Sequence, residues 1–180
     1  MPPSDLRYSA AAIALHWLML VVIACAVGFG LSLDHAPDGW GDTLYRLHWS
    51  FGLTALALAI LRLGNRLIAG APAEHPTLTR LESVLSSLVH KALYGLMLLV
   101  PLLGWLGKSA YGGAITVFGL FNMPALLAQN EALAKKLLGA HEIAVKLFML
   151  CLVLHIAGAL NHALIKRDGL ILRMMPRRRG

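Results

Sequence analysis

Four long stretches with almost no charged side chains restrict the fold of this chain more than any other feature. The runs wholly free of Asp, Glu, Lys and Arg are Tyr8–Leu33, Leu47–Leu61, Ala92–Gly107 and Leu147–Ile165. The second and third runs are short, but they lengthen if Arg62, Arg66 and Lys91 extend their charged ends to the membrane surface. About 20 apolar residues cross a bilayer. The sequence therefore predicts four transmembrane helices.

The expected fold is an all-α integral membrane protein, a bundle of four transmembrane helices in one domain over residues 1–180. The helices are expected over residues 9–33, 44–67, 83–106 and 140–165. In the long third connection, residues 124–138 are expected to form an amphipathic helix that lies on the membrane surface. Composition agrees, because only 14% of the residues are charged, against about 25% in a soluble domain.

Basic residues cluster on one side of the expected bundle, which sets its orientation. They are Arg7, Arg62, Arg66, Arg80, Lys91, Lys166, Arg167, Arg173 and the final run Arg177–Arg179. Because positive charge favours the cytoplasmic side, we expect both termini in the cytoplasm, with the basic tail on anionic lipid headgroups. The net charge of +7 is then largely a membrane signal. A nucleic-acid partner is not expected.

Polar side chains within membrane spans are expensive and usually functional, and this chain has several histidines there. Given the expected direction of each helix, two of them fall in the outer half, His48 and His141. The inner half contains His16, His90, His155 and His162. The remaining two, His35 and His75, fall in loops and are expected to be ordinary exposed residues. His141 and His155 are fourteen residues apart, which places them on one side of a helix about 21 Å apart.

Histidines at two depths in a helix bundle indicate cofactors held between facing helices. Zinc fits poorly, because its sites need three or four protein ligands, and the outer half offers two. Haem iron needs two axial ligands, one on each face of the ring. A CxxCH attachment motif is absent, so the sequence predicts two non-covalent b-type haems with bis-histidine ligation. Arg62, fourteen residues after His48, is expected to bind a haem propionate.

Motifs along nearly the whole chain resemble those of the bacterial cytochrome b561 family, small four-helix di-haem b proteins of the inner membrane. The matching stretches are IALHW, LHWSFG, LRLGNRL, HKALYGLMLLVPLLGW, FGLFNMP, HEIAVKLFMLCLVLHIAGALNH and LILRMMPRRR. The resemblance implies that His48 and His141 ligate the outer haem. It implies His16 and His155 at the inner haem, although depth alone does not separate His90 from His16.

Stand-alone proteins of this kind resemble superoxide:ubiquinone oxidoreductases. That likeness implies oxidation of superoxide to dioxygen at the outer, periplasmic haem and reduction of ubiquinone at the inner haem. Hydrogen-bond donors expected near a quinone are Arg62, Arg66, Asn161, His162 and Lys166, with His162 as a proton relay. A basic entrance for the superoxide anion would use Arg46, Lys108, Lys135, Lys136 and Lys146.

Two other functions compete with this one. A cytochrome b subunit that relays electrons between a partner dehydrogenase or cytochrome c and the quinone pool would use the same ligands. A haemless transporter would use the histidines for protons or metal, but the chain lacks the broken helices and inverted repeat typical of transporters. The sequence leaves the physiological electron donor open.

Overall fold

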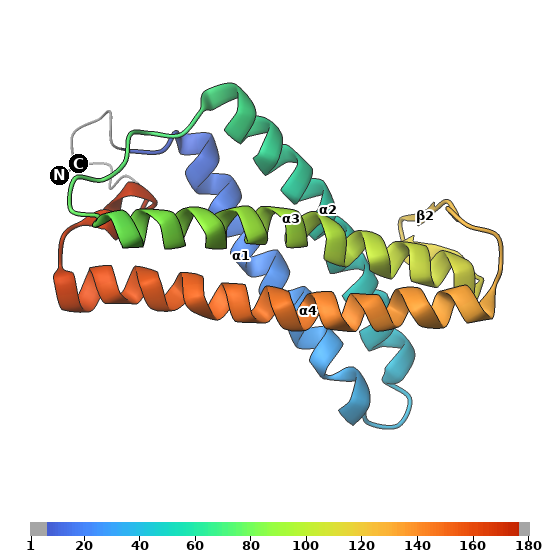
Figure 1. The fold of residues 1–180 in the computed structure, drawn as a ribbon. Helices are drawn as coiled ribbons and strands as arrows, with labels where there is room; N and C mark the ends of the chain where they lie inside the picture. The colour runs from blue at the N-terminus through green and yellow to red at the C-terminus, as the bar shows by residue number, and fades with distance from the viewer. Residues whose placement is uncertain (1–6, 177–180) are drawn as a thin grey trace.

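A computed structural model describes residues 7–176 of the chain, and four long helices form most of it (Figure 1). They are α1 (Ala10–Leu31), α2 (Gly41–Ala69), α3 (Arg80–Tyr111) and α4 (Glu131–Leu160). Each is long and apolar enough to cross a membrane. This confirms the predicted class of fold, an all-α protein with four membrane-spanning helices.

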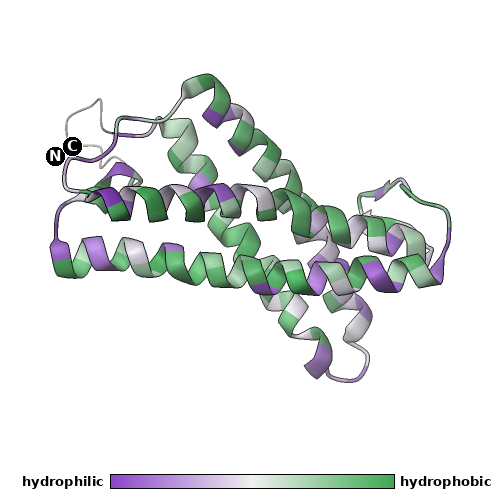
Figure 2. Ribbon diagram, viewed as in Figure 1, coloured by the Kyte–Doolittle hydropathy of each residue, from purple (hydrophilic) through white to green (hydrophobic). Residues whose placement is uncertain are grey.

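The helices pack as two pairs that cross each other. Helix α1 packs along α2, α3 packs along α4, and α2 also contacts α3. Figure 1 shows the first pair crossing the second at a wide angle. A small core of Met19 and Val22 from α1 with Ala55, Leu58 and Ala59 from α2 is buried. Most other apolar side chains face outward, and Figure 2 shows the hydrophilic residues mainly near the helix ends, as lipid surroundings require.

Side-chain caps explain where three of the helices begin. The Ser9 hydroxyl accepts a hydrogen bond from the Ala12 backbone N–H at 3.2 Å. Thr79 and Glu82 form a reciprocal capping box at the start of α3. Asn130 caps α4 by accepting from the Leu133 N–H at 3.0 Å. These caps satisfy backbone donors that a helix start leaves unpaired.

The prediction of a separate amphipathic helix over residues 124–138 is wrong. Residues 124–130 are not helical, and residues 131–138 form the first turns of α4, which continues through Gly139. Packing against α3 explains the difference. A Cβ atom at Gly107 would lie 2.7 Å from the Leu138 side chain, so the two helices touch here, and Ala134 is fully buried. The segment therefore extends the α3–α4 pair instead of lying on the membrane surface.

A two-stranded hairpin precedes that segment, and the sequence patterns did not predict it. Strand β1 (Ile115–Val117) pairs antiparallel with β2 (Phe121–Met123). The turn places Phe118 and Gly119 at positive φ and closes with the Leu120 N–H donating to the Val117 carbonyl at 2.9 Å. The Phe118 N–H donates to the buried Ser50 hydroxyl of α2 at 2.9 Å, which ties the hairpin to the bundle.

The opposite end of the bundle brings the two described ends of the chain together. Helix α4 continues into a wider, π-type turn, η3 (Asn161–Lys166), which is followed by a short 3-10 turn, η4 (Leu170–Arg173). The Tyr8 N–H donates to the Arg173 carbonyl, and the Arg7 guanidinium donates to the Met175 carbonyl at 2.8 Å. Both ends therefore lie on one side of the bundle (Figure 1). The expected lipid contact of Arg177–Arg179 falls outside the described residues.

Candidate functional site

Two histidines from different helices face each other near the hairpin end of the bundle. The ring centroids of His48 on α2 and His141 on α4 lie 6.1 Å apart, with the ring planes at 89°. The Nδ1 of His48 lies 2.8 Å from the Ala26 carbonyl of α1, and that of His141 lies 2.8 Å from the Val100 carbonyl of α3. Since a carbonyl only accepts, each Nδ1 carries the proton. Each Nε2 is left as the nitrogen that can bind a metal.

Glycines make room for these two rings. A Cβ atom at Gly30 would lie 2.9 Å from the His48 ring, and one at Gly104 would lie 3.3 Å from Nδ1 of His141. Any larger residue would push on the imidazoles, particularly at Gly30. The two rings are therefore fixed by both hydrogen bonds and close packing, and all four helices contribute to this pair.

A second pair of histidines lies nearer the end of the bundle where the two described ends of the chain meet. The rings of His16 on α1 and His155 on α4 also have centroids 6.1 Å apart. His90 of α3 lies beside them, with its ring centroid 5.0 Å from that of His155. Its Nδ1–H donates to the Ser86 carbonyl one turn earlier at 2.6 Å. The Nδ1 of His16 is buried and has no hydrogen-bond partner among residues 7–176.

The ring separations test which histidines fit a haem iron between them. A metal–nitrogen bond is about 2 Å and an imidazole nitrogen lies about 1.1 Å from its ring centre, so axial rings lie about 6 Å apart. Both 6.1 Å pairs fit this separation. The 5.0 Å between His90 and His155 is too short. Within the described part of the chain, no group of three or more His, Cys, Asp or Glu side chains is placed to hold a metal ion. The donor arrangement suits paired axial ligands.

Two arginines of α2, Arg62 and Arg66, lie toward the end of the bundle where the described ends of the chain meet. Arg62 donates from Nε to the Tyr94 hydroxyl at 3.4 Å, and its guanidinium carbon lies 5.6 Å from the centre of the Tyr94 ring. One turn further along α2, Nη1 of Arg66 is buried without a hydrogen-bond partner in the described residues. Both arginines line a small pocket with Tyr94 and Met174. Buried cationic donors without a partner are costly, so this pocket favours an anionic group.

His162 of η3 lies in a buried polar cluster, seven residues after His155. Its Nδ1–H donates to Oδ2 of Asp168 at 2.6 Å, and the Thr77 hydroxyl donates to the same oxygen at 2.9 Å. Burial by itself raises the pKa of Asp168, but the hydrogen bonds from His162, the Leu170 N–H and Thr77 outweigh it and lower that pKa from 3.8 to about 2. Asp168 is therefore ionised at neutral pH.

The expectation that His75 is an ordinary exposed loop residue is wrong. His75 is 8% exposed, and its Nδ1 lies 2.7 Å from the Thr77 hydroxyl oxygen. His75 therefore belongs to the same buried cluster as His162 and Asp168. The cluster joins residues far apart in sequence, and no local pattern signals it. His35 is exposed as expected.

The remaining polar residues named from the sequence have varied surroundings. Lys166 pairs with Glu82 of α3, which leaves it less free to contact a quinone. At the hairpin end, Lys135 pairs with Glu131 on the exposed face of α4. The Lys108 ammonium lies 4.6 Å from the centre of the Trp49 ring. Trp49 is the residue directly after His48 in the sequence. Arg46 donates to Thr43, and Lys136 and Lys146 are exposed.

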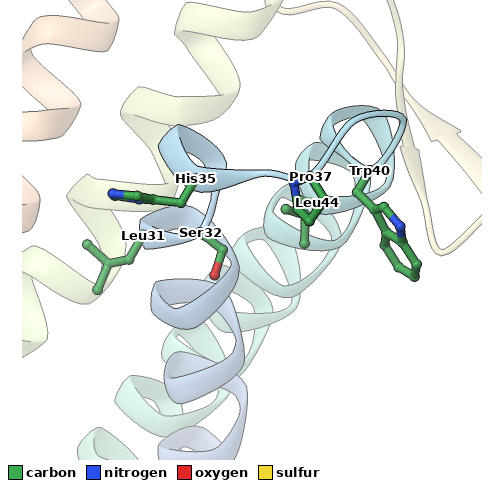
Figure 3. A pocket seen from close by; sticks show the side chains of 6 residues that line it. All are labelled: Leu31, Ser32, His35, Pro37, Trp40 and Leu44. Carbon is green, nitrogen blue, oxygen red and sulfur yellow. The ribbon is translucent and has the colours of Figure 1, made fainter.

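An open hollow lies at the connection between α1 and α2. It is lined by Leu31, Ser32, His35, Pro37, Trp40 and Leu44. Figure 3 shows the His35 and Trp40 side chains extending in opposite directions from it. Neither histidine pair contributes to its lining. We assign it no role in the site.

Comparisons with known proteins find bacterial cytochromes that match this chain over nearly its whole length. A family model described as prokaryotic cytochrome b561 matches residues 7–177. Cytochrome b561 homolog 2 of Escherichia coli K12 is 30% identical, over 94% of this chain and 91% of the relative. A probable superoxide oxidase, CybB, of Yersinia pestis is 28% identical, over 97% and 98% of the two chains. Cytochrome b562 of Cereibacter sphaeroides is 30% identical, over 93% and 94%.

Proposed function

Because the chain belongs to the prokaryotic cytochrome b561 family, we propose that it carries electrons across the bacterial inner membrane between two b-type haems. Family membership and four long apolar helices make it a multi-pass bacterial membrane cytochrome with a redox function. Beyond this, we propose two haems, their histidine ligands, the two substrates and a location in the inner membrane. The two 6.1 Å histidine pairs are the observation that carries it.

We assign the outer haem to His48 and His141 and the inner haem to His16 and His155. In His48 and His141 the Nδ1–H is held by a carbonyl, which would leave Nε2 as the nitrogen that binds the iron and would raise its basicity. When bound, the haems supply reversible one-electron chemistry. Two histidines on one iron leave no open coordination position, which suits electron transfer rather than oxygen binding. The protein's contribution is to fix the two pairs at different depths.

Arg62 and Arg66 would bind the propionates of the inner haem. A propionate offers the anionic oxygens that the unpartnered Arg66 nitrogen lacks. Tyr94 would help to hold Arg62 in place through their hydrogen bond. His90 is packed against His155 and is held by its own helix, so it would shape the inner site without ligating iron.

The favoured reaction is oxidation of superoxide to dioxygen at the outer haem and reduction of ubiquinone at the inner haem. The name of the Yersinia pestis relative, a probable superoxide oxidase, supports the first half. Two superoxide anions supply the two electrons, and one quinone takes them with two protons to become a quinol. His162 would donate protons to the quinone, because it lies close to the inner end of α4. Both termini would lie in the cytoplasm, following the basic residues.

Spectroscopy on the purified protein tests the proposal. Enzymatically generated superoxide should reduce the haems, superoxide dismutase should abolish this reduction, and added short-chain ubiquinone should reoxidise them. If superoxide fails but a co-purifying dehydrogenase or cytochrome c reduces the haems, the protein is instead a subunit that relays electrons to the quinone pool. A colourless protein that stays haem-free after reconstitution would refute both functions.

A further inference from the structure

His162 and Asp168 form a buried pair at the inner end of α4. Their side chains are 8% and 7% exposed, and 2.6 Å separates Nδ1 from Oδ2. The carboxylate only accepts hydrogen bonds, so it holds the proton on Nδ1 and fixes the plane of the ring. Nε2 is then the nitrogen through which His162 can exchange a proton with a third group.

The backbone here departs from regular helix in a way that brings the two side chains together. Residues 161–166 form a π-type turn, a feature often found at functional sites. Arg167 has a φ of 52° and Gly169 a φ of 79°, which turns the chain back so that Asp168 faces His162. A regular helical ending would not place residue 168 against residue 162. The unusual backbone therefore serves this contact.

A second segment holds the carboxylate from the other side. In the connection between α2 and α3, the Thr77 hydroxyl donates to Oδ2 of Asp168, and Nδ1 of His75 lies 2.7 Å from the Thr77 hydroxyl oxygen. The Leu170 N–H donates to Oδ1 at 3.0 Å. The nearby Lys166 ammonium is paired with Glu82, so it does not compete for Asp168. The Thr77 hydroxyl and the Leu170 N–H therefore both donate to the Asp168 carboxylate, one to each oxygen.

We propose that Asp168, held by Thr77, is a positioning residue for His162 as the proton donor to the electron acceptor at the inner haem. The inference rests on the proposed function and identifies what orients its proton donor. His162 is seven residues after His155, which is two helical turns and about 10 Å along the axis. It therefore lies between the inner ligand and the aqueous end of the bundle, where a quinone needs protons that the membrane interior does not supply.

The proton transfers balance the electron transfers. For each proton, the N–H bond at Nε2 of His162 breaks and an O–H bond forms on the reduced quinone, and the imidazolium becomes neutral imidazole. Asp168 keeps its hydrogen bond to Nδ1–H throughout, so the same nitrogen takes the next proton from water. Two electrons and two protons convert one quinone to one quinol. The electrons come from two superoxide anions, which become dioxygen.

The test compares an electron acceptor that takes up protons on reduction with one that does not. Wild-type protein and variants are reduced with dithionite, freed of excess reductant, and reoxidised with ubiquinone-1 or with ferricyanide, which takes an electron without a proton. The variants are Asp168→Asn, Thr77→Val and Thr77→Ser, with Glu74→Gln as a matched exposed carboxylate in the same connection. The haem content and spectrum of each variant are recorded first.

Asp168→Asn is expected to lower the maximal rate with ubiquinone about tenfold or more, while the KM for ubiquinone and the ferricyanide rate stay within about twofold of wild type. Thr77→Val should lower the quinone rate less than Asp168→Asn does, because the Thr77 hydroxyl contacts the Asp168 carboxylate and not His162. Thr77→Ser keeps the hydroxyl and should restore the rate. Glu74→Gln should behave as wild type. If Asp168→Asn is too unstable to purify, the Thr77 pair carries the test.

Two results would overturn the inference. Unchanged quinone rates in Asp168→Asn and Thr77→Val would show that neither residue positions a proton donor. Equal losses with ubiquinone and ferricyanide would show that the cluster only maintains the structure. Failure of the wild type to react with ubiquinone, despite rapid oxidation by ferricyanide, would instead refute the proposed function itself.

Discussion

His48 and His141 face each other from α2 and α4, and each donates a hydrogen bond to a backbone carbonyl of another helix at 2.8 Å. The carbonyls belong to Ala26 on α1 and Val100 on α3. This histidine pair between two helices, which we propose as haem ligands, is thus oriented by the other two helices. Because each imidazole is held independently of its partner, we expect this pair to be largely preformed before it binds iron.

Replacing the ligands should remove the haems one at a time. His48→Ala and His141→Ala should each lose the outer haem, and His16→Ala and His155→Ala should each lose the inner haem. The haem-to-protein ratio should fall from about two to about one in every case, since each iron needs two axial ligands. Pyridine haemochrome assays and redox titrations measure this. His35→Ala, an exposed loop variant, is the control and should keep both haems.

His90→Ala should retain both haems. Its ring centroid is 5.0 Å from that of His155, and its Nδ1–H is bonded to Ser86. Removing it changes the packing beside the inner ligand, so we expect a shift in the inner haem potential without loss of haem. Redox titration monitored by absorbance checks this. Loss of the inner haem in this variant, with its retention in His16→Ala, would reverse our assignment of the ligand.

Gly30→Ala should disturb the outer haem selectively. The new methyl group would lie 2.9 Å from the His48 ring, closer than side chains normally approach. The ring must then shift or rotate, so we expect an altered outer-haem spectrum or a lower outer-haem content. Gly28→Ala, on the same helix with nothing within 4 Å of the added atom, is the matched control. Identical spectra in both variants would mean that the close contact does not constrain the ligand.

Some of this architecture follows directly from the sequence, for physical reasons. Long charge-free stretches have few stable alternatives to membrane helices, and the directions of the helices assign histidines such as His48 and His141 to the same depth. Depth could not decide between His16 and His90, because both lie on the inner side. The distinction depends on ring separation, which is set by where α1 and α3 place these rings relative to His155 of α4.

Other features depend on contacts between distant segments. The start of α4 at Glu131 depends on how closely it packs on Gly107, and the hairpin is held by Ser50 of α2. Thr77 and Asp168 are 91 residues apart, and no local pattern links them. The burial of His75 has the same origin. Periodicity and charge report what each segment prefers alone, so contacts of this kind are beyond them.

Ser50→Ala should loosen the hairpin while leaving the helices intact. The Ser50 hydroxyl accepts a hydrogen bond from the Phe118 N–H, and Ser50 is only 1% exposed. Losing it leaves a donor without its partner, at a cost of about 1–3 kcal/mol. Hydrogen–deuterium exchange over residues 115–123 should become faster. Thr54→Ala, which removes a hydroxyl bonded only within α2, is the control and should leave that exchange unchanged.

The stabilising effect of Asp168 should disappear in acid. The pKa of its carboxyl group is 3.8 in an unfolded chain and about 2 in the folded protein, so the ionised form stabilises the fold. That contribution is complete above about pH 4 and is lost as the pH falls toward 2. Asp168→Asn should therefore lower the Tm at pH 7, and the difference from wild type should narrow between pH 4 and 2.

Thermal unfolding in detergent, at matched protein and detergent concentrations, measures this difference. Other groups also titrate over this range, but they do so in both proteins, so the difference in Tm isolates Asp168. Glu74→Gln serves as an exposed carboxylate control and should show little difference at any pH. A difference for Asp168→Asn that stays constant down to pH 2 would contradict the role assigned to the ionised carboxylate. The hydrogen bonds of His162 and Thr77 would then stabilise the fold equally well when the carboxyl group of Asp168 is protonated.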